Sequence, residues 1–272
     1  MSLEDEGFLS AEISEWVARF RGKFSDWFNL ADRLNRAGQQ IVLRAEITTD
    51  RGAAEPKLIG LLLLVRTLSN FQGSLLLTER GMIVEARTLV RCCLENVFCL
   101  GALLRGDTKF VKEMVGSEVS RRKAMANWML NSKSSVSSQE MAERLRKYVQ
   151  HMTETWDSTQ QMNFERVAER SEVHLLYLHY KLLSGDSAHP TVTALERYII
   201  QAEGQGSTHS VQWGPDYGEA NIPDTLETAC NAATAACIIF TEMINDAEGN
   251  RQVAEIAEEY AQLRDRKAAS TQ

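Results

Sequence analysis

Hydrophobic side chains recur every three or four residues along most of the chain, which is the pattern of amphipathic helices. The first stripe predicts a helix over residues 10–47, with Ser10 as its N-cap. Gly22 or Gly38 could bend or end this helix. After a short loop, Pro56 suits the first turn of the next helix.

Two apolar helices are predicted in the middle of the chain, over residues 57–78 and 82–104. Gly81 marks a tight reversal between them, so the two helices should lie antiparallel. We expect the second helix to end at Gly106, and a separate, more polar helix to continue to about Leu130.

The pattern then predicts several shorter helices. Ser137 and Glu140 form a capping-box pair at the start of one of them. Two more are predicted near residues 160–169 and 172–184, and Gly185 begins a break in the helical pattern.

The longest stretch without helical periodicity is 201–223, which is rich in Gly, Ser, Asn and Asp. Loops of this length are usually functional or disordered, so this one is a candidate lid, with a small β-hairpin at 211–213. Asp224 and Glu227 form a second capping-box pair and predict further helices over 224–266.

These elements predict an all-α fold, an antiparallel bundle of about seven to nine helices with one long irregular loop. Neither an internal repeat nor a domain boundary is visible, so residues 1–272 are expected to form one domain. Its core would be residues 57–200, with the N-terminal helix 10–47 and the C-terminal helices 224–266 packed on it.

Charge narrows the classes of partner. The net charge of −7 argues against general nucleic-acid binding. Residues 105–151 differ from the rest, because ten Lys/Arg stand there against five Asp/Glu, a local excess of five positive charges. A solvated helix face is favoured over an RNA-binding surface as the explanation.

The five cysteines are odd in number and form no CxxC pair, which favours reduced thiols over a disulfide or a zinc site. No secretory signal is visible, and the apolar stretch 58–65 is too short to cross a bilayer. We therefore expect a cytoplasmic protein with no metal, no cofactor and no membrane association. The apolar helices could support a homodimer, but no pattern selects one.

Charged residues interrupt the helix predicted over 82–104. Arg87, Arg91 and Glu95 fall within an arc of about 80° at 100° per residue, on a helix that is otherwise apolar all round. Charges in such surroundings must be paired or face a cavity. A ladder within the helix explains them poorly, because Arg placed before Glu is the weaker order. A structural network and a ligand-binding or catalytic pocket both stay open.

A second polar cluster lies about 90 residues later, where Tyr180, Ser184 and His189 fall within ten residues. Pro190 suits the first position of a following helix, which would place His189 at the N-terminal end of that helix. A loop histidine that caps the turn is one interpretation. The other is a polar group that faces the charged arc of the earlier helix.

Two motifs carry a resemblance to a known family. Arg91 and Glu95 form Arg-x-x-x-Glu, and residues 180–190 contain Tyr-x-x-x-Ser followed by His-Pro. Over about residues 58–192 the chain resembles a family of uncharacterised bacterial all-helical proteins. The resemblance implies no established reaction. The matching positions are Arg91, Glu95, Tyr180, Ser184 and His189.

The helical-hairpin layout more distantly resembles HEPN domains, many of which are RNA-cutting toxins or defence proteins. Their signature is an arginine followed by a histidine after four to six residues. The three corresponding slots before His189 hold no arginine. Arg144 and Arg146 stand at suitable distances before His151, but about one such match is expected by chance.

We interpret the protein as a cytosolic binding or regulatory protein, with bacterial defence or stress response as its setting. In this interpretation Arg87 and Arg91 bind a small anion or a nucleotide, with Tyr180 and Ser184 beside them.

Two alternatives stay open. In a HEPN-like ribonuclease or another metal-independent hydrolase, His189 would be the general acid/base and Arg91 would stabilise the phosphate of the transition state. Glu95 would then pair with Arg91 or His189. In a structural interaction protein without a ligand site, the same cluster would only fix the register of the helices.

Overall fold

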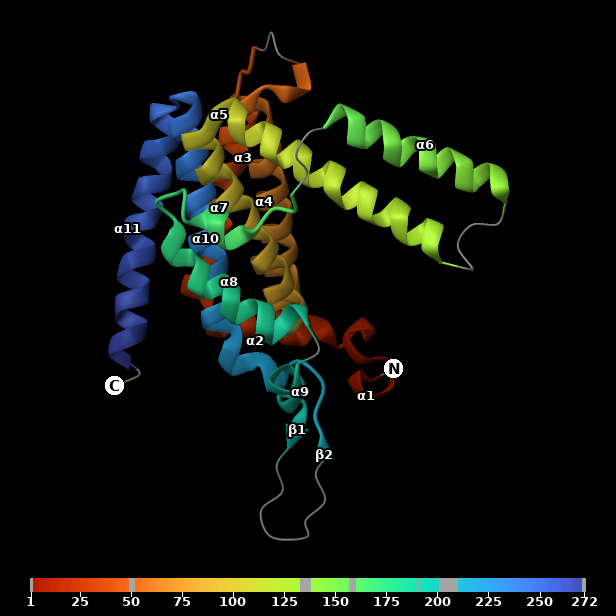
Figure 1. Cartoon of the computed structure of the whole chain (residues 1–272). Helices are drawn as coiled ribbons and strands as arrows, with labels where there is room; N and C mark the ends of the chain where they lie inside the picture. Colours follow the sequence, from red (N-terminus) through yellow and green to blue (C-terminus); the bar gives the residue numbers. More distant parts are fainter. Residues whose placement is uncertain are drawn as a thin grey trace.

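The computed structural model describes residues 2–48, 52–132, 138–156, 160–189, 191–200 and 210–270. Within these residues the chain is almost entirely helical, so the predicted all-α fold is confirmed (Figure 1). In chain order the elements are α1 (Leu3–Glu6), η1 (Gly7–Leu9), α2 (Ile13–Lys23), α3 (Ser25–Arg44), η2 (Gly52–Ala54), α4 (Pro56–Thr78), α5 (Ile83–Asn131), α6 (Gln139–Thr155), α7 (Phe164–Ala168), η3 (His174–Leu176), α8 (Tyr177–Leu183), η4 (Ser184–Ala188), α9 (Val192–Glu196), β1 (Ile199–Ile200), β2 (Ser210–Val211), η5 (Asp216–Asn221), α10 (Ile222–Ile244) and α11 (Ala247–Ser270).

The bundle is centred on α4 and the first half of α5, which pack along each other, and α10 packs against both. Helices α3 and α11 pack against α10 and against each other. Burial of aromatic side chains dominates the stability of such a core. Six phenylalanines are fully buried in it: Phe20, Phe28, Phe71, Phe98, Phe110 and Phe240.

The reversal between α4 and α5 depends on Gly81, as the sequence predicts. Its φ is +76°, a backbone conformation that residues other than glycine rarely adopt. A Cβ at this position would lie 2.5 Å from the carbonyl oxygen of Pro215, so the turn is also too crowded for a side chain. The predicted antiparallel pair is therefore confirmed, and its turn lies against the chain that leads into α10.

The prediction of one helix over 10–47 is wrong, because the chain breaks at Phe24 into α2 and α3. The change of direction there lets Phe20 of α2 and Phe28 of α3 both reach the core. Ser10 does not cap α2, which follows Glu12 and has no side-chain cap. The hydroxyl of Ser10 instead accepts the backbone N–H of Glu12.

The prediction that a helix ends at Gly106 is also wrong, since α5 continues through it without interruption for 49 residues. One glycine within a helix costs only about 1 kcal/mol. Burial of Phe110 and Val111 on the next turn offsets that cost.

Beyond this point α5 leaves the bundle and pairs with α6, and the two project together as an arm (Figure 1). We use "the arm" for residues 112–131 of α5 together with α6. None of the residues of α6 is buried. Ser138 caps α6 by accepting the backbone N–H of Met141 at 3.2 Å, whereas the predicted cap, Ser137, lies outside the described residues.

Residues 201–209 of the loop predicted at 201–223 lie outside the described ranges. A two-stranded antiparallel sheet is present, but its strands are not those predicted at 211–213, because Ile199 lies opposite Val211 and Ile200 opposite Ser210. The rest of this stretch is more regular than expected, since it forms η5 and the start of α10.

The capping box predicted at Asp224 is wrong. Helix α10 starts earlier, at Ile222, because a proline fits its first turn. Asp224 and Glu227 instead both contact the ammonium group of Lys267 on α11, and the Glu227 contact measures 2.6 Å.

Helix α4 is long and apolar enough to cross a membrane by length and composition. The apolar stretch 58–65 considered from the sequence is only part of this helix. Core helices of bundles share this length and composition, and α4 packs along α5 and α10. All five cysteines are free thiols, as predicted. Burial raises the pKa of the Cys93 and Cys230 thiols, which keeps them protonated.

Candidate functional site

Arg87 is the centre of the first polar network. Its side chain projects from α5, and only 13% of it is exposed. Nη1 donates to Asp186 at 2.6 Å, Nη2 donates to the side-chain oxygen of Asn221 at 3.0 Å, and Nε donates to the hydroxyl of Thr225 at 3.1 Å. Each nitrogen of the guanidinium thus has an acceptor, and the three acceptors lie on η4, η5 and α10.

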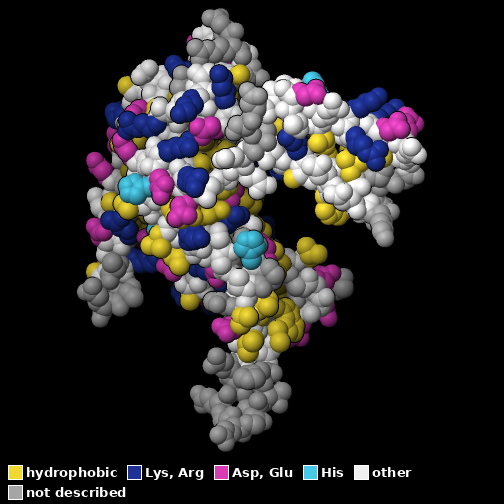
Figure 2. Space-filling model, viewed as in Figure 1, with side chains coloured by type: hydrophobic (Ala, Val, Ile, Leu, Met, Phe, Trp, Pro, Cys, Tyr) yellow, Lys and Arg dark blue, Asp and Glu magenta, His cyan; other side chains and the backbone are white. Residues whose placement is uncertain are grey.

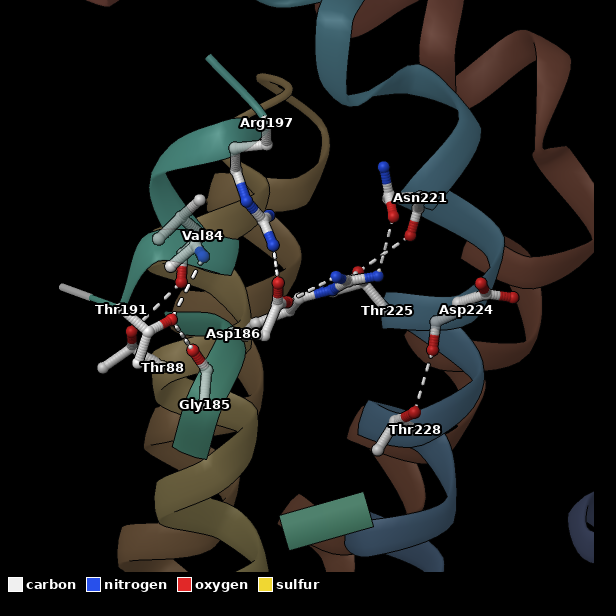
Figure 3. A network of polar contacts seen from close by, with 12 residues as sticks. Val84, Thr88, Gly185, Asp186, Thr191, Arg197, Asn221, Asp224, Thr225 and Thr228 are labelled. Carbon is white, nitrogen blue, oxygen red and sulfur yellow. Dashed lines mark hydrogen bonds and ion pairs between the residues drawn. The ribbon is translucent and has the colours of Figure 1, made fainter. Parts of the chain in front are cut away.

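Asp186 joins this network to a second arginine. One carboxylate oxygen accepts from Arg87, and the other contacts Nη2 of Arg197, which follows α9 (Figure 3). Arg197 is also largely buried, with 17% of its side chain exposed. Two guanidinium groups therefore share one carboxylate, and this trio carries a net positive charge.

Burial shapes the electrostatics of both arginines. Loss of solvent lowers the pKa of Arg87, and the nearby charge of Asp224 partly opposes this. Burial also lowers the pKa of Arg197, and the positive charge of Arg87 lowers it further. Arginine stays charged all the same, so both groups would gain from an additional anion.

Arg91 forms a second network, one helical turn further along α5. Its Nε donates to the hydroxyl of Ser184 at 3.0 Å, and its Nη2 donates to the hydroxyl of Tyr180 at 3.0 Å and contacts Glu95 at 2.9 Å. The hydroxyl of Tyr180 in turn donates to Glu95 at 3.3 Å. The guanidinium also lies over the Tyr180 ring, 5.0 Å from its centroid.

The structure therefore brings together most of the residues singled out from the sequence. Arg91, Glu95, Tyr180 and Ser184 form one hydrogen-bonded cluster in which Glu95 pairs with Arg91. The cluster holds α8 and η4 against α5. Arg87 lies in the separate network described above.

His189 does not join either network in the described part of the chain. The residue is exposed, and its backbone carbonyl accepts a hydrogen bond from the backbone N–H of Thr191 at 2.8 Å. Helix α9 begins at Val192 with Thr191 as its cap, so His189 is not at a helix N-terminus as predicted. Pro190, the predicted first residue, lies outside the described residues.

A cavity of about 800 Å³ lies beside Arg87. Its walls come from α5, the α8–η4 segment, α10 and α11. Arg87 and Lys267 contribute positive charges, Asp186, Asp224 and Glu227 contribute negative ones, and Val90, Leu182 and Leu183 contribute apolar surface. Arg91 is not among its lining residues, so the cavity belongs to the Arg87 network.

Two further basic side chains border the cavity. His179 and Lys181 both project from α8, and neither has a carboxylate partner among the described residues. Lys181 lies near the Tyr177 ring, 6.0 Å from its centroid. The hydroxyls that line the cavity are already committed, since Thr191, Thr225 and Thr228 each donate to a backbone carbonyl.

Besides Asp186, sequence reasoning missed three residues of the Arg87 network. Asn221 and Thr225 lie more than 130 residues later in the chain, and Arg197 reaches the site through Asp186. Asp186 stands inside the polar cluster noted from the sequence and could have been assigned to Arg87. No comparable signal marks Arg197, because a single arginine after a short helix is ordinary in a sequence.

The predicted absence of a metal site remains an expectation. In the described part of the chain, His, Cys, Asp and Glu side chains form no group of three that could hold a metal ion. The basic stretch at 105–151 is largely the arm, where side chains such as Arg121 and Arg144 pair with glutamates of the same helix.

The fold and site define an all-α bundle protein with a buried arginine centre beside a cavity. A model of a family of unknown function (DUF5677) matches residues 57–207, more than half of the chain. The chain belongs to this family. The match includes α4, α5 and α8–η4, and it ends before Asn221 and Thr225. Comparison with curated proteins gave no match, and comparison with solved structures gave none either.

Membership of this family confirms the predicted resemblance to an uncharacterised family. The HEPN-like resemblance and the bacterial setting stay predictions.

Proposed function

We propose that this is a cytosolic binding protein whose cavity beside Arg87 takes a small molecule with an anionic group. The observation that carries the proposal is the placement of Arg87, which presents a fixed, largely buried guanidinium at the wall of a cavity of about 800 Å³. A volume of this order suits a ligand the size of a nucleotide.

Three contacts fix the guanidinium before any ligand arrives. Hydrogen bonds to Asn221 and Thr225 anchor it to η5 and α10, and the bond to Asp186 anchors it to η4. A ligand would therefore meet a group that loses little conformational freedom on binding. Arginine in such a position suits carboxylates and phosphates, whose geometry matches its fork of N–H donors.

The rim of the cavity supports an anionic ligand as well. Lys181 brings a cation to one side of the opening, and no ion pair with a carboxylate is found for it among the described residues. Apolar side chains such as Val90 and Leu182 leave room for an uncharged part of the ligand.

Binding explains the site better than catalysis does. The described hydroxyls of the cavity donate to backbone carbonyls, so none is paired with a base as a nucleophile would be. His189, the base of the hydrolase alternative, does not line the cavity. We assign the Arg91 cluster a structural role, since its polar groups satisfy one another.

The experiment is isothermal titration calorimetry of the full chain with three probes: inorganic phosphate, adenosine monophosphate and succinate. At least one probe should bind, and Lys181→Ala should weaken its affinity by roughly threefold, as expected for the loss of one screened charge. Arg251→Ala is the matched control, because Arg251 is an exposed cation of α11 outside this cavity.

The control variant should bind like the wild type. Absence of binding by all three probes would overturn the proposal, and so would equal weakening by Lys181→Ala and Arg251→Ala, which would indicate only a long-range effect of charge.

A further inference from the structure

The carboxylate of Asp186 lies between two arginines. Its oxygens each contact a different guanidinium, that of Arg87 at 2.6 Å and that of Arg197 (Figure 3). Charge-assisted hydrogen bonds from arginine are the strong contacts by which proteins recognise carboxylate and phosphate ligands. Asp186 and Arg87 both line the cavity, so this ion pair can be reached from it.

The two arginines retain unused capacity to donate hydrogen bonds. Nε of Arg197 is buried and has no hydrogen-bond partner in the described structure. The bonds of Arg87 described above use three of the five N–H donors that a guanidinium carries. A phosphate has more acceptor oxygens than a carboxylate, so it could use donors that Asp186 leaves free.

Asp186 stands on a segment suited to move. It lies in η4, a π-helical turn, and such turns are uncommon and often occur at functional sites. The adjacent Gly185 has open space where a Cβ would be. One side-chain bond that holds the turn is the hydroxyl of Thr191 donating to the carbonyl of Gly185 at 2.7 Å.

We propose that Asp186 is an internal occupant of an oxyanion subsite, and that the anionic group of the ligand, a carboxylate or a phosphate monoester, replaces it between Arg87 and Arg197. This inference rests on the function proposed above and adds the group that the ligand must displace. When the ligand binds, the η4 turn releases its carboxylate, so occupancy of the cavity changes the conformation of η4.

Competition of this kind lowers the apparent affinity of the wild type. A ligand binds only molecules in which the carboxylate has left, and its apparent dissociation constant increases as that fraction falls. If Asp186 has left the two arginines in about one molecule in ten, removal of its charge should tighten ligand binding about tenfold.

The test compares Asp186→Asn with Asp224→Asn by calorimetry, using the same phosphate, adenosine monophosphate and succinate. Each substitution replaces one carboxylate on the cavity wall with an amide of nearly the same size, so the charge is lost while the volume of the side chain is kept. Asp224 is the matched control because its charge also acts on Arg87, yet it contacts Lys267 rather than the arginine pair. Phosphate and succinate show which oxyanion the subsite prefers.

We expect Asp186→Asn to bind about tenfold more tightly than the wild type, and Asp224→Asn to change affinity by less than about threefold. Equal effects of the two substitutions, or no effect of Asp186→Asn, would overturn the internal-occupant proposal while ligand binding itself stands. No binding by any of the three proteins would overturn the proposed function as well.

A second measurement covers the case in which Asp186→Asn fails to fold. Hydrogen exchange of the wild type should become faster at the backbone amides of η4 when the probe is added, because the turn loses its two ion pairs. A ligand that only adds contacts would slow exchange there, and this result would contradict the proposal.

Discussion

Both halves of α5 carry arginines and glutamates, but the surroundings of these charges differ. In the bundle half, Arg87 is 13% exposed and is held by residues from other elements, 99 or more positions away in the chain. In the arm, Arg121 is 60% exposed and pairs with Glu118, three residues away on the same helix. One continuous helix thus contains both a buried charge centre and a solvated charged surface.

The difference shows how the same residue types acquire different roles. A buried arginine must find acceptors, because unpaired burial of its charge is costly, and those acceptors fix neighbouring segments in place. An exposed arginine has water as an alternative partner, so its ion pair has little influence on stability. Substitutions in the two halves should therefore have unequal consequences.

The largest effect is expected for Arg87→Ala. The substitution leaves Asn221 and Thr225 without their donor and removes one of the two cations that hold Asp186. Loss of one partner from a buried network costs about 3 kcal/mol, so the free energy of unfolding should fall by about this amount. Urea denaturation followed by circular dichroism measures it.

Arg33→Ala is the control for this prediction. The Arg33–Glu259 pair also joins two elements, α3 and α11, but both side chains are more than 40% exposed. Its loss should cost less than about 1 kcal/mol. If the two variants lose the same stability, burial is not the property that separates the two kinds of site.

A smaller effect is expected for Tyr180→Phe in the Arg91 cluster. The substitution keeps the ring but removes the hydroxyl that accepts from Arg91 and donates to Glu95. Hydrogen bonds to charged groups are worth about 1.5 kcal/mol or more, which is the expected decrease in the free energy of unfolding.

Tyr177→Phe provides a close comparison, since the Tyr177 and Tyr180 rings stack with centroids 5.6 Å apart. The hydroxyl of Tyr177 only approaches Glu165, at 3.5 Å on the surface. Its removal should change stability by less than about 0.5 kcal/mol. Equal losses from both tyrosines would mean that ring packing, not the charged cluster, explains the effect.

Local patterns were enough to predict much of this architecture. Helical periodicity gave the all-α fold, and the glycine at position 81 gave the antiparallel α4–α5 pair. The motif residues Arg91 and Tyr180 were predicted to meet, and they do. Each of these inferences depends on residues close in sequence, or on charges that must be paired because the helix around them is apolar.

What the sequence could not show depends on tertiary packing. Helix α5 continues through Gly106 because buried residues beyond it contribute more than the glycine costs. The assignment of Arg87 to Asp186, and the convergence of Arg197 on the same carboxylate, require knowledge of how η4 and α9 fold back on α5. Such contacts leave no periodic trace in the sequence.

The smallest effect is expected in the arm, for Arg121→Ala. Glu118 has 40% of its side chain exposed and keeps a second partner in Arg122, so the unfolding midpoint should change little. The pair should still be visible in titration, because hydrogen bonds from both arginines lower the pKa of the Glu118 carboxyl to about 2. Any stability from a carboxylate with a lowered pKa is present above its unfolded value and is lost as the pH falls toward 2.

NMR titration of the Glu118 carboxyl in the wild type and in Arg121→Ala gives its pKa in each protein, and this is compared with the two unfolding midpoints. The pKa should increase only partly in Arg121→Ala, because Arg122 still donates to the carboxylate, and the unfolding midpoint should change correspondingly little. A marked loss of stability would mean that the arm depends on its ion pairs as the bundle depends on Arg87. The contrast between the two halves of α5 would then lie in sequence distance rather than in burial.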